Sequence, residues 1–393
     1  MLLLNDVRIL DFGRYIAGPF CAALLADLGA DVIRIEKVDG SEDRFTTPVS
    51  RDGDGAGFMQ LNRNKRGLTL NPRKPEGRQI LDRLIPTADI VIANLPPDTL
   101  GSMGLDYESL RTLRSDIILT TSTAFGASGP YATRVGFDGV AQAMSGNMHM
   151  TGNADEPTKN YFPYVDFTTA SLNAMATLAA IIHRDKTGDG QHVQGCLLAS
   201  ALSIANGTMI EQALLGVNRS GTGNRGQTSA PSDTFQTKDG WILVQVVGNP
   251  LYERWARLMG ENLWLVDSKY ATDESRGIHA QDISTRMQEW TGSRTTTEAV
   301  KALEDARIPC GEVLSPQEAL DNEQVQSMGF LEPIEYPGID TAAPIAQMPI
   351  DFSTLDVSIR RRAPTLGEHT DEILESLGFD KGDISSFREA RAI

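Results

Sequence analysis

Short apolar runs alternate with amphipathic segments through the first 125 residues, and this alternation constrains the fold more than any other feature of the chain. Gly13 and Gly18 mark the turn after the first apolar run, and Pro19 suits the start of a helix, where its missing N–H costs nothing. Strands that alternate with helices imply a parallel sheet covered by helices, so we predict an α/β fold. The predicted strands are 7–11, 31–36, 89–94 and 116–120, and the predicted helices are 19–28, 75–88 and 107–113.

The pattern changes after about Leu202. A polar glycine-rich loop at 221–227 is followed by a hairpin turn at 238–240, and these features predict a smaller α+β domain. Its expected elements are a strand at 241–246 and helices at 251–259, 281–290 and 297–307. We divide the chain into the N-terminal part of a large domain (1–202), a small domain (203–327), and a return segment with the C-terminal part of the large domain (328–393), which ends in a helix at 368–377.

Composition excludes several classes of partner. The chain has 52 acidic and 36 basic residues among 393, a formal charge of −16, and therefore lacks the basic footprint of a nucleic-acid-binding protein. Cys21, Cys196 and Cys310 match neither a disulfide framework nor a metal site, and they fit a reduced, cytoplasmic setting. The opening residues break too early for a signal peptide, and no apolar run approaches the roughly eighteen residues of a membrane span, so we expect no membrane partner.

Three common chemistries lack their motifs. The fingerprint Gly-x-Gly-x-x-Gly is absent from the first turn, which disfavours a nicotinamide cofactor. The five histidines are scattered and none forms a ligand pair with a carboxylate, so we expect no metal. No Gly-x-Ser-x-Gly elbow is present, which leaves serine hydrolysis without support.

Asp166 lies at the start of a long small-residue segment that is predicted to be a buried helix ending at Gly188. The helix N-terminus has unpaired N–H groups and a partial positive charge, so we expect the carboxylate to stay ionised. An ionised carboxylate is a nucleophile. Asp is also a favoured cap or first-turn residue with no further role, and the segment alone leaves both interpretations open.

Two polar loops each allow a structural and a functional interpretation. The basic segment, residues 62–67 (Asn62-Arg63-Asn64-Lys65-Arg66-Gly67), is either a solvated loop or a phosphate site, in which Arg supplies a planar fork and Lys a point charge. The glycine loop, residues 221–226, is either a flexible connector or a segment that approaches a ligand closely or closes as a lid.

Taken together, these motifs resemble the family III CoA-transferases, the group that contains formyl-CoA transferase and carnitine CoA-transferase, with alpha-methylacyl-CoA racemase as a divergent relative. No single motif is specific, but their joint order along nearly the whole chain is. The matching stretches are 10–12 with 17–19 and 28–36, then 62–66, then the Asp166 helix with 186–191, then 238–241, and finally 363–370.

The resemblance implies a reaction and an assembly. In such enzymes an Asp carboxylate, which matches Asp166 here, attacks an acyl-CoA and forms a mixed anhydride and then an aspartyl-CoA thioester, from which CoA passes to a carboxylic acid acceptor. CoA thioester is then a substrate, and no permanently bound cofactor is expected. The resemblance also implies a Rossmann-like large domain, a small inserted domain, and a homodimer of two interlocked ring-like subunits.

The resemblance assigns binding residues as well. Residues expected at CoA are Lys37, Lys65, Arg66, Asn94, Leu95 and Met103, with Lys65 and Arg66 at its phosphates. Residues expected at the substrate or its lid are Ile16, Phe137, Asp138, Gly223, Asn224, Arg225 and Gly226. Ile16, Ser102, Asn224 and Arg225 depart from the formyl-CoA transferase pattern, so that activity is not expected. Arg225 suggests a carboxylated acceptor such as a dicarboxylate.

Two alternatives remain for comparison. The racemase branch has a His in a Gly-His-Asp motif, where this chain has Gly136-Phe137-Asp138. Racemisation needs a base on one face of the α-carbon and an acid on the other, and Phe137 can be neither. A non-catalytic CoA-binding protein is the second alternative, and the presence of Asp166 argues against it. Asp138 is expected either to orient the acceptor or to serve as a helix cap.

Overall fold

A computed structural model describes residues 2–393 and divides them into two compact units. The larger unit contains the chain up to Gly146, then Asn160–Ile210 and Met328–Ile393. The smaller unit contains Asn147–Lys159 and Glu211–Ser327. We expected residues 147–159 in the large domain, but they belong to the smaller unit, because Asn153 forms a bridge with Thr222 of the glycine loop.

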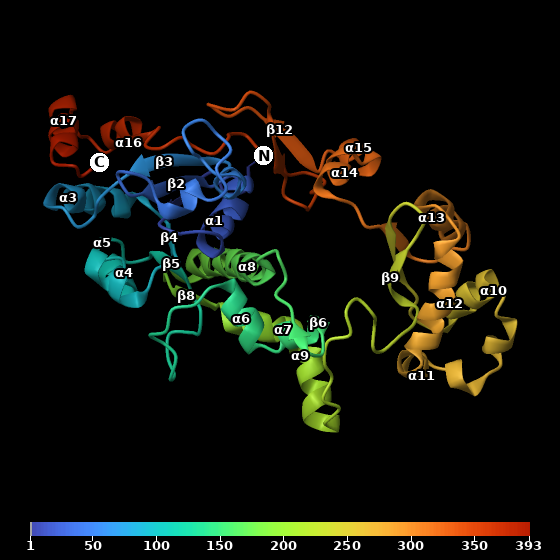
Figure 1. Ribbon diagram of the computed structural model, residues 1–393. Coiled ribbons are helices and arrows are strands. Elements are labelled where there is room, and N and C mark those ends of the chain that lie inside the picture. The colour runs from blue at the N-terminus through green and yellow to red at the C-terminus, as the bar shows by residue number, and fades with distance from the viewer. Residues whose placement is uncertain (1) are drawn as a thin grey trace. The chain divides into compact units, whose positions relative to one another are not determined.

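A six-stranded sheet organises the larger unit, in the order β3-β2-β1-β4-β5-β8 with every pair parallel (Figure 1). The strand order reverses between β1 and β4, and ligands of such sheets bind in the crevice at the carboxyl ends of the strands beside that reversal. The predicted α/β fold with a parallel sheet is confirmed. The strands are β1 (Arg8–Asp11), β2 (Asp31–Glu36), β3 (Lys65–Thr69), β4 (Ile90–Ala93), β5 (Ile118–Thr123) and β8 (His192–Cys196).

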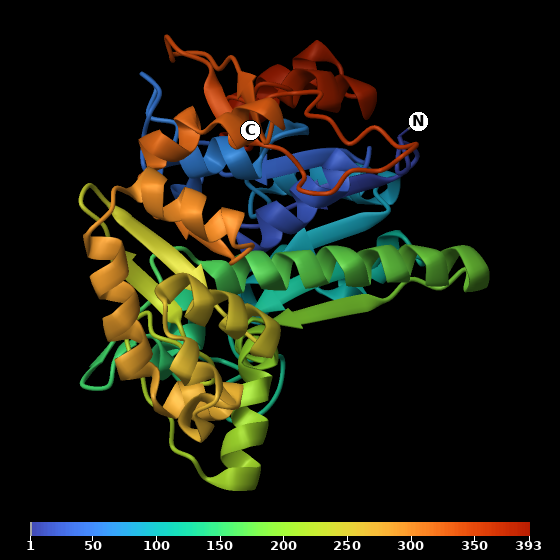
Figure 2. The same cartoon turned by 90° about the vertical axis from the view of Figure 1, so that its right-hand side faces the viewer.

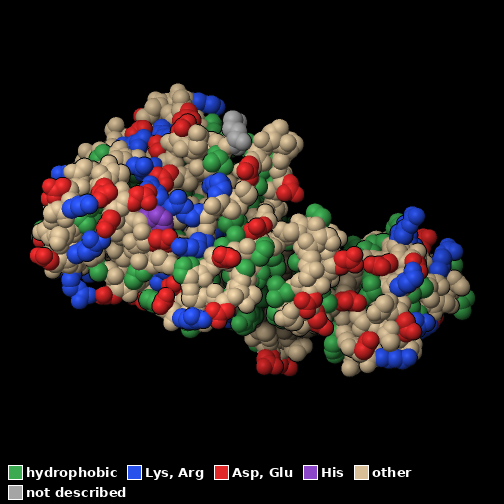
Figure 3. Space-filling view, turned by 90° about the horizontal axis from the view of Figure 1, so that it is seen from above, with side chains coloured by type: hydrophobic (Ala, Val, Ile, Leu, Met, Phe, Trp, Pro, Cys, Tyr) green, Lys and Arg blue, Asp and Glu red, His purple; other side chains and the backbone are tan. Residues whose placement is uncertain are grey.

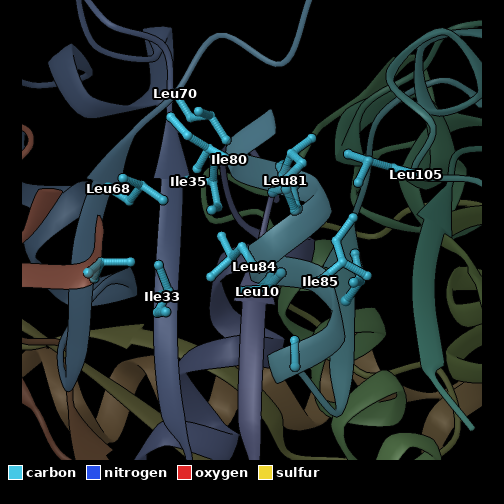
Figure 4. Close-up of a cluster of buried hydrophobic side chains, with 14 of the residues drawn as sticks. Leu10, Ile33, Ile35, Leu68, Leu70, Ile80, Leu81, Leu84, Ile85 and Leu105 are labelled. Atoms are coloured by element: carbon cyan, nitrogen blue, oxygen red, sulfur yellow. The ribbon is translucent and has the colours of Figure 1, made fainter. Parts of the chain in front are cut away.

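Helices cover both faces of the sheet, because alternate strand residues point to opposite sides and both sides are apolar. Leu10 faces a core that it shares with Ile80, Leu81 and Leu84 of α3 (Figure 4) and with residues of α4, α5, α16 and α17. Ile9 faces a core shared with α1 and α8. The helices of the first face are α3 (Pro75–Leu84), α4 (Pro97–Met103), α5 (Tyr107–Leu113), α16 (Thr370–Ser376) and α17 (Lys381–Glu389); those of the second are α1 (Ala17–Asp27) and α8 (Tyr164–Thr187).

Helix α8 runs alongside β5 and β8 (Figure 2) and ends where Gly188 adopts the left-handed conformation. Its 24 residues are long and apolar enough to cross a membrane by length and composition, so our statement that no such run exists is wrong. Half of the apolar window is buried within the fold, as in the core helix of a globular unit, so this feature is weak evidence for a span.

The return segment packs on the larger unit through a small apolar cluster. Its hairpin of β12 (Leu331–Ile334) and β13 (Ala343–Ala346) contributes Ile345, which is buried with Phe58 and Tyr336.

On the face shown in Figure 3, acidic and basic side chains are intermingled. The remaining α-helices described in the larger unit are α2 (Ala56–Leu61), α6 (Asp138–Met144) and α9 (Leu197–Leu215), the last of which continues into the smaller unit.

The smaller unit has its own core around Trp255, Ile242 and Met287, all fully buried. The predicted hairpin turn is confirmed, since the Thr237 amide donates to the Gly240 carbonyl at 2.9 Å between two antiparallel strands. The elements are β6 (Gly152–Asn153), β7 (Glu156–Pro157), β9 (Ser232–Gln236), β10 (Trp241–Gln245), β11 (Cys310–Glu312), α7 (Asn147–Met150), α10 (Asn249–Met259), α11 (Asp273–Ile278), α12 (Ala280–Gly292), α13 (Thr296–Asp305), α14 (Pro316–Asp321) and α15 (Glu323–Ser327).

Candidate active site

A cavity of about 330 Å³ opens at the carboxyl edge of the sheet, where the chain leaves β1, β4 and β5. This is the position that the reversal of strand order predicts for a ligand. Asp166 contributes to its wall. The other lining residues are Arg14, Tyr15, Ile16, Ala17, Asn94, Leu95, Pro96, Pro97, Asp98, Ser122, Thr123, Ala124, Ala132, Thr133, Arg134, Val135, Gly136, Phe137 and Leu197.

The N-termini of two long helices contribute to this wall. Ala17 is the first residue of α1 and Asp166 is the third residue of α8. The side chain of the residue before each helix caps neither, although the Asp138 carboxylate accepts from the Asp166 amide in α8. The first N–H groups of a helix have no partner within it, and they carry the positive end of the helix dipole. The cavity is therefore suited to negative charge, although the whole chain carries a formal charge of −16.

The environment of Asp166 makes its carboxyl group a weaker acid than usual. Burial, and then the negative charge of Asp138, raise the pKa of Asp166 to about 7. Our expectation that the helix N-terminus keeps this carboxylate fully ionised is therefore wrong, because desolvation disfavours the charged form. A carboxyl group that titrates near neutral pH in a cavity is a common feature of active sites.

Asp138 holds the backbone at the start of α8. It is buried, and its Oδ2 accepts a hydrogen bond of 3.0 Å from the Asp166 amide. Its Oδ1 accepts from Gln142 Nε2, and Gln142 Oε1 in turn accepts from the Asn160 amide at 3.0 Å. Both oxygens of Asp138 thus have partners within the protein, which favours a positioning role over direct contact with an acceptor.

The loop after β1 is joined to the loop after β4 by a pair of hydrogen bonds. The Arg14 amide donates to Asn94 Oδ1 at 2.6 Å, and Asn94 Nδ2 donates to the Arg14 carbonyl at 2.7 Å. The structure thus brings together four predicted site residues from distant parts of the chain, because they line one cavity: Ile16, Asn94, Leu95 and Phe137, beside Asp166.

Two predicted CoA residues lie outside the cavity wall. Lys37 is exposed just beyond the end of β2 and is paired with Glu42. Met103 ends α4 and packs partly buried against the core. Their contacts with CoA stay predictions.

The basic segment is not a solvated loop, because most of its side chains are buried. Lys65 is 0% exposed, and a side chain without accessible surface cannot touch a ligand, so its predicted contact with a phosphate is wrong. Arg66 is the second residue of β3 and lies near the amino end of that strand, whereas the cavity lies at the carboxyl edge of the sheet. Its guanidinium group binds Asp31 at 2.7 Å and Glu372 at 2.9 Å. The structure gives no support to its predicted phosphate contact, since Arg66 lies away from the cavity and carboxylates of the protein pair with its guanidinium group.

The glycine loop belongs to the smaller unit. Gly223 adopts the left-handed conformation, with φ of 70°, and Asn224 Nδ2 donates to Thr234 Oγ1 at 3.0 Å. Arg225 is hydrogen-bonded to Gln281. The roles of Gly223, Asn224, Arg225 and Gly226 at the substrate stay predictions.

Tyr15, Arg14 and Arg134 are among the cavity residues that were missed from the sequence. Tyr15 adopts a left-handed backbone, with φ of 57°, and its ring meets the Phe137 ring edge to face at 5.6 Å. The guanidinium group of Arg14 donates to the backbone carbonyl groups of Phe12, Gly13 and Ile35. Burial, followed by the charge of Arg34, lowers the pKa of Arg14 to about 10. Arg134 stacks on Tyr131 at 4.5 Å from the ring centroid. The position of Arg14 after β1 was the available signal, since loops at that edge bind ligands.

Comparison with known proteins identifies the family. The model of CoA-transferase family III matches residues 4–370. The chain belongs to CoA-transferase family III. Its relatives include succinyl-CoA:mesaconate CoA-transferase of Haloarcula marismortui, 33% identical over 96% of this chain and 97% of that protein. A succinate–glutarate CoA-transferase of Agrobacterium fabrum is 32% identical over 95% of each chain. This family III member is accordingly an enzyme, a CoA-transferase.

Solved structures support the same assignment. A CAIB/BAIF family protein from Brucella suis superimposes with a TM-score of 0.83 at 30% identity, over 94% of this chain and 98% of that one. Rv3272 from Mycobacterium tuberculosis superimposes with a TM-score of 0.80 at 26% identity, with the same coverage. The family III chain therefore shares its fold with these proteins over 94% of its residues.

Proposed function

We propose that Asp166 is the nucleophile of a CoA transfer from an acyl-CoA donor to a small carboxylic acid, through an aspartyl-CoA thioester. The observation that supports this proposal is a carboxyl group that lines a cavity together with the uncapped N-terminus of α1. A nucleophile needs a substrate within reach, and an oxyanion needs donors within reach. Asp166 and the first amides of α1 supply both in one cavity.

The steps balance without water or a further reactant. The Asp166 carboxylate attacks the thioester carbonyl, the C–S bond breaks, and CoA leaves as a thiolate while a mixed anhydride forms. The thiolate attacks the aspartyl carbonyl and releases the donor acid, which leaves aspartyl-CoA thioester. The acceptor carboxylate repeats the sequence in reverse and leaves as the new thioester, which regenerates Asp166. Thioester and anhydride have similar acyl-transfer reactivity, so each step is feasible.

CoA is proposed to lie along the carboxyl edge of the sheet. Asn94 and Leu95 line the cavity beside Asp166, and Lys37 is exposed at the end of the neighbouring strand, where its ammonium group suits a phosphate. Met103 completes the proposed contacts at the end of α4. Lys65 and Arg66 take no part in this proposal.

Intact-mass measurement after incubation with succinyl-CoA tests the mechanism. The wild-type protein should gain the mass of CoA minus water, hydroxylamine should remove the adduct, and Asp166→Asn should gain nothing. An adduct of equal yield on Asp166→Asn would refute the assignment. Absence of any adduct in the wild-type protein, with transfer still measurable, would refute the covalent mechanism.

We further propose that the exchanged acids are dicarboxylates. Relatives of this chain are named for succinate with mesaconate or glutarate, and a second carboxylate buried in a cavity needs a cation. Arg134 lines the cavity, and none of the ion pairs within residues 2–393 involves it. Stacking on Tyr131 uses the face of its guanidinium group and leaves the edge free for a carboxylate.

A matched pair of variants tests this substrate class. Arg134→Gln should raise KM for a dicarboxylate acceptor about tenfold and leave KM for a monocarboxylate acceptor unchanged, since one charge-assisted contact contributes about 1.5–3 kcal/mol. Arg111→Gln is the control, because Arg111 also lies over a tyrosine ring, Tyr107, but outside the cavity. An equal loss of affinity for every acyl-CoA would assign Arg134 to CoA instead.

The racemase alternative has less support. Phe137 lines the cavity at the position where racemases have a His, and it has no group that can transfer a proton.

We also propose a homodimer, as the resemblance implies. Helix α8 exposes Leu172, Met175 and Ile182, and exposed apolar helix faces commonly pack against a partner. A cytoplasmic location is proposed from the three free cysteines.

A further inference from the structure

Lys65 connects two ends of a loop that lines the cavity. Its Nζ donates to Asp11 Oδ2 at 2.7 Å, to the Pro19 carbonyl at 2.8 Å and to Asn62 Oδ1 at 2.9 Å. Asp11 ends β1, and Pro19 lies in the first turn of α1. An ammonium group has three donors, so all three are used within the protein.

The same loop is held between those ends by further buried contacts. Asp11 Oδ1 accepts from the Gly13 amide at 2.8 Å, and the Gly13 carbonyl accepts from Arg34, whose side chain is 0% exposed. Arg14 is fixed by Asn94, as described above. Every residue from Asp11 to Arg14 thus has a contact that restricts the path of the loop.

These contacts enforce a conformation that the loop would not adopt by itself. Tyr15 has a left-handed backbone, which is unfavourable for an aromatic residue, and it is 43% exposed. Strain of this kind persists only where the surrounding structure determines it, and it is concentrated at functional sites. Tyr15, Ile16 and Ala17, which follow, all line the cavity beside Asp166.

We propose that Lys65 is a positioning residue for the transfer reaction: with Asp11 it fixes the Gly13–Ala17 loop, so that the first amides of α1 are aimed at the acyl group on Asp166. This inference rests on the proposed role of Asp166 and extends it to a residue whose side chain is fully buried. A buried ion pair contributes little net stability compared with apolar side chains, so three buried bonds from one lysine call for a positional explanation.

The test compares Lys65→Met with Arg66→Gln. Methionine keeps an unbranched side chain of similar length and removes the ammonium group. Arg66 is the adjacent residue of the same strand, but its partners lie at the amino end of the sheet, so its variant is the matched control. Three quantities are measured on the full chain: the dissociation constant of succinyl-CoA, the single-turnover rate of adduct formation, and hydrogen–deuterium exchange of the Gly13–Ala17 amides.

For Lys65→Met we expect the dissociation constant to stay within about twofold of wild type and the adduct rate to fall roughly 10–100-fold, since small misplacement of a catalytic group costs about that much. Amides of the loop should exchange faster. Arg66→Gln should change none of the three quantities. A raised dissociation constant with an unchanged rate at saturation would make Lys65 a ligand residue. Wild-type values of the dissociation constant, the adduct rate and the amide exchange would make it merely structural.

A second variant is needed in case Lys65→Met does not fold, because that substitution leaves the buried Asp11 carboxylate with Arg34 as its remaining cation, at 3.7 Å. Asp11→Asn with Lys65→Met removes both charges, and neutral replacement of a buried pair is commonly tolerated. The folded double variant should show the slow rate and the fast exchange, and wild-type values would refute the proposal. If the wild-type protein forms no adduct, the role of Asp166 fails, whereas loop exchange in the variants still decides the positioning role.

Discussion

The basic segment and the cavity hold charged side chains in opposite ways. In the basic segment each cation has a carboxylate partner: Arg63 binds Asp27 at 2.6 Å and Lys65 binds Asp11 at 2.7 Å. In the cavity Asp166 has no cation in any ion pair of residues 2–393, and its pKa is raised to about 7. Satisfied charges indicate a structural role, whereas an unsatisfied one in a cavity indicates chemistry.

The largest effect that would test this contrast is the loss of the unpaired carboxyl group. Asp166→Asn should lower the transfer rate about a thousandfold or more, as removal of a nucleophile does, with little change in acyl-CoA affinity. Steady-state kinetics and calorimetric binding measure the two quantities. A residual rate above one-tenth of wild type would place the chemistry elsewhere.

The same variant should be more stable than wild type at alkaline pH. Because the folded-state pKa of Asp166 is raised from 3.8 to about 7, its contribution to stability is complete below pH 3.8 and is lost as the pH rises to about 7. The Asn side chain does not ionise, so the variant keeps its unfolding free energy over this pH range. We expect a gain of about 4 kcal/mol at pH 8 and none at pH 3.5, measured by urea unfolding, because each unit of pKa difference corresponds to about 1.4 kcal/mol.

Breaking a satisfied pair should affect the fold instead of the chemistry. Arg63→Met leaves the fully buried Asp27 without its cation and should cost about 3 kcal/mol of unfolding free energy. Urea unfolding measures the cost, and the turnover of the folded fraction should stay near wild type. A large fall in turnover with normal stability would contradict the structural role.

The pH dependence of the reaction sharpens the comparison further. Activity should rise with pH through about 7, because only the ionised Asp166 attacks the thioester. Asp138→Asn removes the neighbouring negative charge and should move that midpoint to lower pH by about one unit. The pH profile of the single-turnover rate is the measurement, and an unmoved midpoint would show that burial alone sets the pKa.

The smallest effect is expected at the exposed end of the basic segment. Arg66→Gln breaks pairs with Asp31 and Glu372, of which Glu372 is largely exposed, and should cost less than about 1 kcal/mol. Acyl-CoA affinity should be unchanged. Thermal unfolding and calorimetry measure both, and a clear loss of affinity would restore Arg66 as a phosphate ligand.

Much of the fold could be predicted because its signals are local. The alternation of apolar and amphipathic segments located β2 and α5 with their observed bounds, and the turn at 238–240 located a hairpin. Strands β3 and β8 were missed. Both lie at edges of the sheet, and their Lys, Arg, His, Gln and Gly residues are poor indicators of strands.

The sequence by itself determined the parallel sheet, the family and the position of Asp166 at a helix start, because each depends on patterns within a few residues or on motif order. Only the tertiary structure decided what the charged residues do. Lys65 was predicted at a phosphate, but it is buried against Asp11, 54 positions away in the sequence. Asp138 and Asp166 are 28 positions apart and meet only when α6 and α8 pack. Whether a charge is solvated, paired or isolated depends on which distant groups surround it, and burial and Coulomb interactions between such groups are set by the completed fold.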